Sequence, residues 1–319
     1  MSVSLKTGLA VVALLSSQPA TALLGERMPF EAFDRLPATR VAVSGGELQV
    51  AFGPGELALA RERVVQWVTS AAHAVATYYG RFPATTTRVL IVPQAGRGVR
   101  SGKAWAYRGA ALRIVLGEQS TVADLERDWV LVHEMTHLAF PSVPDRHHWI
   151  EEGLASYVES IARVQSGQWS AQSAWSELVA GMPNGLPRAG DRGLDNTPTW
   201  GRTYWGGALF CLLADVEIRR RTNNRFGLQH SLRAILSHGN MQSASALAPL
   251  LAIGDRAVGV PVLTELYAQM RDRPVEVDLD ELWRKLGIER EGRGVRFNDS
   301  APEAAIRRAI MAAPSPPTP

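Results

Sequence analysis

The chain has 319 residues, of which 46% are hydrophobic and 20% charged, with 28 glycines, 19 prolines and one cysteine. This composition predicts a globular protein of one or two domains and excludes a disordered or collagen-like chain. The lone Cys211 excludes an internal disulfide and a four-cysteine metal site, so any metal must be bound by histidine and carboxylate. The formal net charge of +3 is far below the basic excess of nucleic-acid-binding proteins, so no nucleic-acid partner is expected.

The first 22 residues have the pattern of a signal peptide. Lys6 precedes an apolar run over residues 7–15, and the small residues Ala20 and Ala22 are typical of a cleavage site after Ala22. The apolar run is too short to span a bilayer, and no later stretch reaches 18 uncharged apolar residues. We therefore expect an exported protein, periplasmic or secreted, with no stable membrane span once Leu23 is the first residue. An uncleaved anchor is the alternative.

The first part of the chain predicts a helix followed by strands. Residues 55–79 carry apolar positions at helical spacing and end at Gly80, a typical helix stop. The β-branched run at residues 88–92 predicts a buried strand. Residues 102–107 and 110–116 predict the two strands of a hairpin.

Helices dominate the rest of the chain. A helix is predicted over residues 121–139, because Thr121 and Asp124 resemble a capping box and the periodic run stops before Pro141. A stretch rich in Gly, Pro and Asn at residues 181–199 predicts a long loop. Further helices are predicted at residues 148–165, 203–221, 226–237, 260–271, 278–286 and 302–312.

This order of elements predicts an α+β fold with a helical second half. The predicted segments are a signal peptide at residues 1–22, a first domain at 23–222, a helical C-terminal portion at 223–313 and a disordered tail at 314–319. The motifs that carry chemistry all lie in the first domain.

The predicted helix over residues 121–139 contains His-Glu-Met-Thr-His at residues 133–137. Two histidines four residues apart lie one helical turn apart on the same face, so His133 and His137 can bind one ion. A catalytic zinc takes three protein ligands and keeps a fourth position for water. Glu134 lies beside the first histidine, where it can take a proton from that water. Two surface histidines on an amphipathic helix are the alternative.

The next predicted helix contains Trp-Ile-Glu-Glu-Gly-Leu-Ala-Ser-Tyr-Val-Glu at residues 149–159. With the first motif, it resembles the gluzincin metallopeptidases of the aminopeptidase N-like branch, whose third ligand lies in a Trp-Leu-Asn-Glu-Gly-Phe-Ala-Ser-Tyr run. The resemblance implies a thermolysin-like zincin catalytic domain, with a small mixed sheet and active-site helices, in which His133, His137 and Glu152 bind one zinc ion. The fourteen residues between His137 and Glu152 are fewer than in the family, which shortens the loop before the second helix.

Several neighbouring residues leave alternatives open. Glu151, where the family has Asn, is the alternative third ligand. His147 and His148 could contact metal or substrate, although ordinary surface histidines are the simpler interpretation. Glu159, on the same helix face as the proposed ligand, is either an acceptor for the second N–H of a metal-bound histidine or a solvated charge; Asp128 is a weaker candidate. Manganese and cobalt also fit these ligand types, but zinc is favoured.

Residues 204–208 read Tyr-Trp-Gly-Gly-Ala. They resemble the Tyr-x-Lys-Gly-Ala motif of the same enzymes, with Gly206 in place of Lys. The family tyrosine stabilises the oxyanion, which implies the same role for Tyr204. A tyrosine that merely packs at the start of a helix is the alternative. Cys211, in the following apolar helix, is expected to be buried without a chemical role.

Residues 102–106, Gly-Lys-Ala-Trp-Ala, stand where the family has a Gly-x-Met-Glu-Asn strand that binds the free amino group of the substrate. Trp105 takes the place of the glutamate. The strand could still pair with an extended peptide through backbone hydrogen bonds, but it lacks the carboxylate for an N-terminal amine. Both endopeptidase and aminopeptidase action therefore remain open.

The sequence thus predicts an exported zinc metallopeptidase whose catalytic domain covers residues 23–222, with Glu134 and Tyr204 as its catalytic residues and a peptide or protein as its substrate. Two alternatives belong to other classes. One is a catalytically inactive zinc-binding or assembly protein that keeps the peptidase-like fold. The other is a hydrolase of non-peptide amides. The sequence leaves the oligomeric state open.

Overall fold

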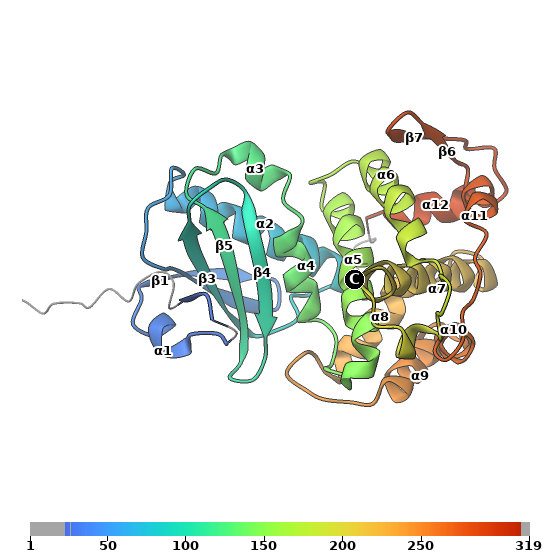
Figure 1. Cartoon of the computed structure of the whole chain (residues 1–319), viewed down its shortest axis with the longest axis horizontal. Coiled ribbons are helices and arrows are strands. Elements are labelled where there is room, and N and C mark those ends of the chain that lie inside the picture. Colours follow the sequence, from blue (N-terminus) through green and yellow to red (C-terminus); the bar gives the residue numbers. More distant parts are fainter. Residues whose placement is uncertain (1–22, 26, 314–319) are drawn as a thin grey trace, which may run out of the picture.

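The structure is a computed structural model that describes residues 23–25 and 27–313. The predicted signal peptide at residues 1–22 and the predicted tail at 314–319 lie outside the described residues. Figure 1 shows two lobes. The sheet lobe, residues 27–137, holds the larger sheet, and the helical lobe, residues 148–313, holds most of the helices.

Five strands of the sheet lobe form one mixed sheet in the order β1-β2-β3-β5-β4. They are β1 (Ala38–Val43), β2 (Gly46–Phe52), β3 (Thr86–Gln94), β4 (Val99–Trp105) and β5 (Ala110–Gly117). β3 is parallel to β2 and β5, whereas β4 pairs antiparallel with β5 and is an edge strand. β3, β4 and β5 confirm the predicted strand and hairpin. β1 and β2 are not predicted from the sequence. β1 is the other edge strand, and its mostly exposed side chains give no clear apolar alternation.

Both faces of the sheet are covered, which explains why β5 is buried along its whole length. Helices α2 (Arg61–Tyr79) and α4 (Val130–His137) pack on one face within the main apolar cluster. The other face carries α1 (Phe30–Phe33) and Leu23, which form a second apolar cluster with Trp105. α2 ends at Gly80, as predicted, where the left-handed φ of +82° suits glycine.

Two short helices replace the single helix predicted over residues 121–139; they are α3 (Val122–Glu126) and α4 (Val130–His137). Thr121 and Asp124 form the predicted capping box at the start of α3. Asp128 then accepts the first two backbone N–H groups of α4, each at 3.1 Å. A second helix therefore starts at this carboxylate, which satisfies donors that would otherwise be unpaired.

The helical lobe confirms the remaining predicted helices, with ends moved by a few residues. They are α5 (His148–Gln165), α7 (Gly207–Arg221), α8 (Leu228–His238), α10 (Val262–Met270), α11 (Leu279–Leu286) and α12 (Ala304–Met311). In this lobe, four further helices and strands are not predicted from the sequence: α6 (Ala171–Gly181), α9 (Leu247–Val258), β6 (Ile288–Glu291) and β7 (Gly294–Phe297). Pro249 makes α9 difficult to predict because proline usually interrupts a helix. Proline is nevertheless tolerated in the first turn, where Pro249 lies. Short 3₁₀ turns lie in the loops: η2 (Asp145–His147), η3 (Met182–Gly185) and η4 (Leu194–Asn196).

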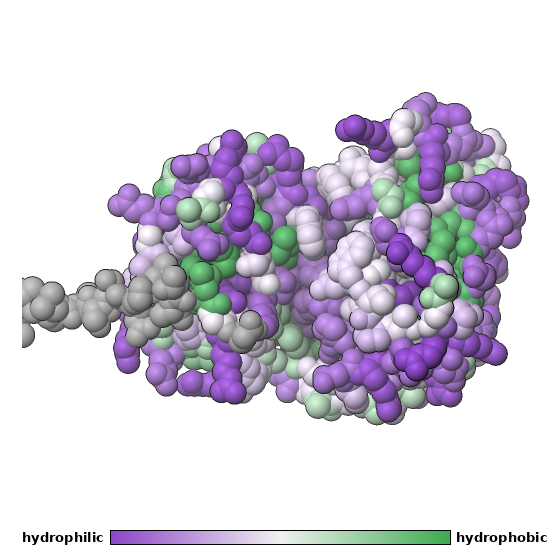
Figure 2. All heavy atoms as spheres, in the orientation of Figure 1, coloured by the Kyte–Doolittle hydropathy of each residue, from purple (hydrophilic) through white to green (hydrophobic). Residues whose placement is uncertain are grey.

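One apolar cluster includes residues of both lobes, from Leu48 in β2 to Met311 in α12. Cys211 is buried in this cluster, as predicted. Figure 2 shows polar side chains over much of the visible face, whose outline is indented where the lobes meet. Among the described residues, no helix combines the length and the apolar character that a bilayer span requires.

Candidate active site

Helix α4 carries the His-Glu-Met-Thr-His motif at the border between the lobes (Figure 1). His133 and His137 lie one turn apart with ring centroids separated by 4.9 Å. His133 is buried and His137 half-buried. The four-residue spacing therefore turns both imidazoles toward the same side of α4, as the sequence predicts.

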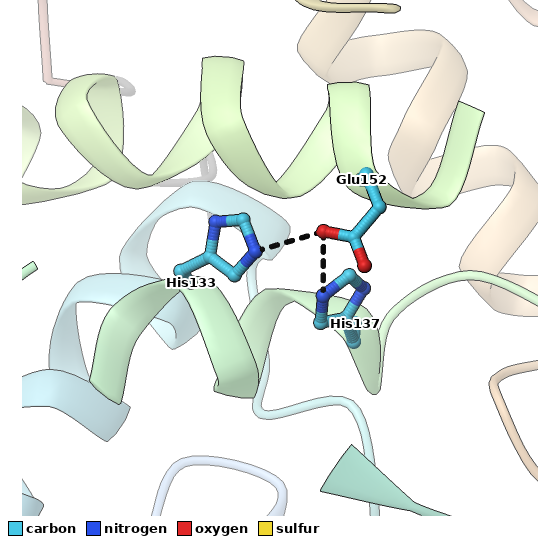
Figure 3. A group of neighbouring side chains, drawn as sticks. All are labelled: His133, His137 and Glu152. Carbon is cyan, nitrogen blue, oxygen red and sulfur yellow. Dashed lines mark hydrogen bonds and ion pairs between the residues drawn. The ribbon is translucent and has the colours of Figure 1, made fainter. Parts of the chain in front are cut away.

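Helix α5 brings Glu152 to these two histidines (Figure 3). One carboxylate oxygen, Oε2, lies 3.2 Å from Nε2 of His133 and 3.6 Å from Nε2 of His137. The histidines come from the sheet lobe and the glutamate from the helical lobe, so the group joins the two lobes.

The chemistry and the size of this group fit one zinc ion. The three candidate ligand atoms all lie within 4.8 Å of one another, a span that one ion with bonds of about 2.0–2.2 Å can bridge. Two imidazole nitrogens and one carboxylate oxygen form the donor set of a catalytic zinc site. His133, His137 and Glu152 are therefore the residues that would bind the metal.

The charges of the two glutamates differ because their surroundings differ. Burial alone would raise the pKa of Glu152, but hydrogen bonds with His133, His137 and His148 outweigh burial and hold this pKa well below its usual range. Glu152 is thus an ionised ligand candidate. Burial raises the pKa of Glu134 to about 7, a value that suits proton transfer near neutral pH.

A cleft of about 600 Å³ opens beside the group, lined by residues of β4, α4 and α5 and by Tyr204. Gly102 brings β4 unusually close to α4 in this cleft. A Cβ atom at Gly102 would lie 2.5 Å from Cγ of Glu134 and 2.8 Å from Cγ1 of Val130. Only glycine therefore allows the strand to run beside Glu134 without moving it.

Tyr204 lies in a π-helical turn, η5 (Gly201–Gly206), that leads directly into α7. Its ring stacks on the ring of His133 at a centroid distance of 6.2 Å. Burial, and then the negative charges of Glu152 and Glu134, raise the pKa of Tyr204 to about 12. The hydroxyl group thus stays protonated at neutral pH and can donate a hydrogen bond into the cleft.

Two glycines allow α5 and α7 to approach each other closely. A Cβ atom at Gly153 would lie 2.3 Å from Cα of Gly207, and one at Gly207 would lie 2.1 Å from the carbonyl oxygen of Trp149. Gly153 follows Glu152 directly, and η5 with Tyr204 leads into Gly207. The close contact of the two helices therefore brings the tyrosine to the metal group.

Glu151, the alternative ligand, is engaged elsewhere. Its Oε1 accepts the backbone N–H of Val143 at 3.2 Å, and its Oε2 lies 3.0 Å from Nδ1 of His148. Nε2 of His148 lies 3.2 Å from Oε1 of Glu152. His148 thus contacts Oε1 of Glu152, whereas His133 and His137 contact Oε2. The geometry favours Glu152 over Glu151.

Asp195, in the turn η4, is a functional candidate that no sequence pattern reveals. Its Oδ1 accepts the indole N–H of Trp149 at 2.8 Å and lies 2.9 Å from Nδ1 of His147, while its Oδ2 accepts the hydroxyl of Tyr267 at 2.9 Å. His147 is therefore a buried partner of this carboxylate, not a surface residue. The contacts hold the start of α5, three residues before Glu152, against η4 and α10.

Two predicted neighbours of the metal site have other roles. Glu159 is buried, accepts the hydroxyl of Ser160 at 2.8 Å and pairs with Arg163 at 3.6 Å. Both interpretations of Glu159, as a partner of a metal-binding histidine or as a solvated charge, are therefore wrong. The Asp128 carboxylate caps α4 by accepting the backbone N–H groups of Val130 and Leu131.

No protein-family model matches the sequence, and no curated protein matches it either. Solved structures do match: over most of its length the chain has the fold of M1 zinc metallopeptidases and of the aminopeptidase N family. One of them is an aminopeptidase N family protein from Idiomarina loihiensis, with a TM-score of 0.58, 13% identity, and coverage of 80% of this chain and 49% of that chain.

An M1 zinc metallopeptidase from Deinococcus radiodurans matches with a TM-score of 0.51 and 14% identity, over 76% of this chain and 53% of that chain. A mutant of it, bound to a Tyr-Ser-Ala substrate, matches equally well. Identities this low show the fold alone. The chain spans about half the length of these proteins.

Proposed function

We propose that the protein is an exported zinc-dependent metallopeptidase. The observation that carries the proposal is the meeting of His133, His137 and Glu152 at one point of a cleft that also holds Glu134 and Tyr204. The fold likeness to zinc metallopeptidases, one of them solved with a bound peptide, supports a peptide substrate. The thermolysin-like arrangement of the catalytic domain and the specificity for zinc are parts of the same proposal.

Each residue of the cleft has a defined task in this proposal. Zinc, when bound, supplies a Lewis acid that lowers the pKa of water and polarises the scissile carbonyl. Glu134 accepts the proton of the attacking water and passes it to the leaving amine. Tyr204 donates a hydrogen bond to the oxyanion that forms as the carbonyl is attacked.

Strand β4 supports binding of an extended peptide, because it is an edge strand beside the cleft and an added strand can pair with its backbone. Its Trp105 is buried with Leu23 on the opposite face of the sheet. β4 therefore supplies no carboxylate for an N-terminal amine. The products of digestion distinguish internal from terminal cleavage.

Export is supported by the signal-like pattern of residues 1–22, which lie outside the described residues. Cleavage after Ala22 would leave Leu23 as the first residue. An intact-mass measurement of the exported protein tests this part of the proposal, and a mass that includes residues 1–22 would contradict it.

Replacement of Glu134 by Gln tests the proposed chemistry. Glutamine is similar in shape but cannot accept the proton, so we expect zinc to be retained and turnover to fall at least about 100-fold. The measurement is a mass-spectrometric digest of a peptide library, with and without a chelator, together with the zinc content. The matched control is Glu62→Gln, an exposed residue at the start of α2, which should keep full activity.

The same digest separates the alternatives. Activity of Glu134→Gln within a few-fold of the parent would contradict the role of Glu134. A parent protein that holds zinc but cleaves no peptide would favour the inactive binding protein or the hydrolase of non-peptide amides.

A further inference from the structure

His148 lies in the cleft beside the candidate metal group without belonging to that group. It lines the same cleft as Glu134 and Tyr204, and its side chain is 55% exposed. The three candidate ligand atoms that lie within 4.8 Å of one another do not include a nitrogen of His148. Metal binding therefore does not explain the place of this imidazole in the cleft.

Both ring nitrogens of His148 face carboxylates of α5. Nδ1 lies 3.0 Å from Oε2 of Glu151, and Nε2 lies 3.2 Å from Oε1 of Glu152. Spacings of three and four residues bring these side chains onto one face of the helix. An ionised carboxylate only accepts hydrogen bonds, so His148 is the donor in its contact with Glu152. His148 thus acts on the metal group through the glutamate.

Glu151 fixes the imidazole of His148 from the other side. Its second oxygen, Oε1, accepts the backbone N–H of Val143 at 3.2 Å. A chain of contacts therefore runs from the loop after α4 through Glu151 and His148 to Glu152. Because each side of the imidazole has its own partner, the ring cannot turn away from Glu152 without losing a contact.

The two oxygens of Glu152 have separate partners. Oε2 faces His133 and His137, and Figure 3 shows this oxygen alone joined to the two histidines. Oε1 faces His148. A carboxylate can bind a metal through one oxygen or through both, and a second oxygen would occupy a position that a catalytic zinc keeps for water. A residue that holds Oε1 therefore protects that open position.

We propose that His148 is a positioning residue that restricts Glu152 to one ligand oxygen, Oε2, and so keeps room for the attacking water. The inference rests on the proposed metal centre and adds to it a residue that does not bind the metal. The role requires an N–H donor at the place of Nε2, whereas a role in packing alone would require only a ring of this size. Substitutions that separate the donor from the ring therefore test it.

The visible absorption spectrum of the full-length, cobalt-loaded protein tests this role without turnover, because its bands weaken as the number of ligands rises above four. His148→Phe removes the donor but keeps a ring. We expect it to bind cobalt, since all three ligands are intact, with weaker bands than the parent. His148→Gln, whose amide can donate to Oε1, should restore the spectrum of the parent. His73→Phe, at an exposed position of α2 that does not line the cleft, is the matched control and should equal the parent.

Peptide cleavage by the zinc-loaded variants is the second measurement. We expect kcat of His148→Phe to fall about 10–100-fold and His148→Gln to recover most of the loss. A His148→Phe variant with the spectrum and the kcat of the parent would overturn the role of His148 and leave the proposed function intact. If the parent binds cobalt but cleaves no peptide, the proposed function fails and the spectra still decide the role of His148. A parent that binds neither zinc nor cobalt would contradict the metal centre, and this role with it.

Discussion

Gly102 positions the proposed general base although it has no chemistry of its own. Its missing side chain lets β4 pass within contact distance of Glu134 and of the first residue of α4. An added methyl group must displace either β4 or Glu134.

We predict that Gly102→Ala lowers kcat/KM at least about ten-fold, because small misplacements of catalytic groups have large effects. The zinc content should stay the same, since the atoms nearest to the new methyl group belong to Glu134 and Val130 and not to the three candidate ligands. Gly294→Ala is the matched control, because a Cβ atom there makes only ordinary contacts. The measurement is the steady-state kinetics of both variants. Full activity of Gly102→Ala would show that the close approach of β4 to Glu134 is unimportant for catalysis.

Sequence patterns predict some of these residues and not others. His133, Glu134 and His137 share one short motif, and Glu152 stands in a segment with a recognisable neighbour pattern, so their approach could be expected. Asp195 gives no such signal, because a single aspartate in a long loop has no spacing to a partner.

At the scale of elements, the position of Glu152 depends on how the start of α5 is held. Asp195 joins the residues just before and at the first turn of α5 to the hydroxyl of Tyr267 in α10. These groups are largely buried. A donor or acceptor among them that loses its hydrogen bond is therefore not readily satisfied by water, and the loss lowers the free energy of unfolding. The metal group is therefore coupled to helices that do not line it.

We predict that Asp195→Asn destabilises the protein by about 1–3 kcal/mol and lowers kcat/KM, because the amide would turn a donor toward one of three donors. Tyr267→Phe, which removes one hydrogen bond only, should have the smaller effect on both quantities. Thermal or urea unfolding and peptide cleavage measure the two effects. An Asp195→Asn variant as stable and as active as the parent would refute this role of Asp195.

The elements themselves are predictable where the local signals are strong. The hairpin of β4 and β5 has clear apolar strands and a glycine turn, and α2 ends at a glycine. The split between α3 and α4 is not predictable, since the apolar spacing continues through the break and only the cap at Asp128 starts the second helix. Helix α9 is difficult to predict because Pro249 suggests a break in the helix. In the structure Pro249 lies in the first turn, where proline is tolerated.

At the scale of the whole molecule, the candidate metal group lies where the two lobes meet. α4 of the sheet lobe supplies both histidines and α5 of the helical lobe supplies the glutamate (Figure 3). The cleft and the edge strand β4 both lie at this border. The order of strands and helices predicts an α+β fold with a helical second half. The close approach of α5 and α7 at the cleft depends on contacts such as Gly153 with Gly207, which the order of elements does not reveal.

The most direct test is a crystal structure of the zinc-loaded protein, with data measured on both sides of the zinc absorption edge. We predict one anomalous peak at about 2.0–2.2 Å from Nε2 of His133, Nε2 of His137 and a carboxylate oxygen of Glu152, with its remaining side open to the cleft. A zinc ion bound by other residues, or fully loaded protein without a peak between these three side chains, would contradict the proposed metal centre.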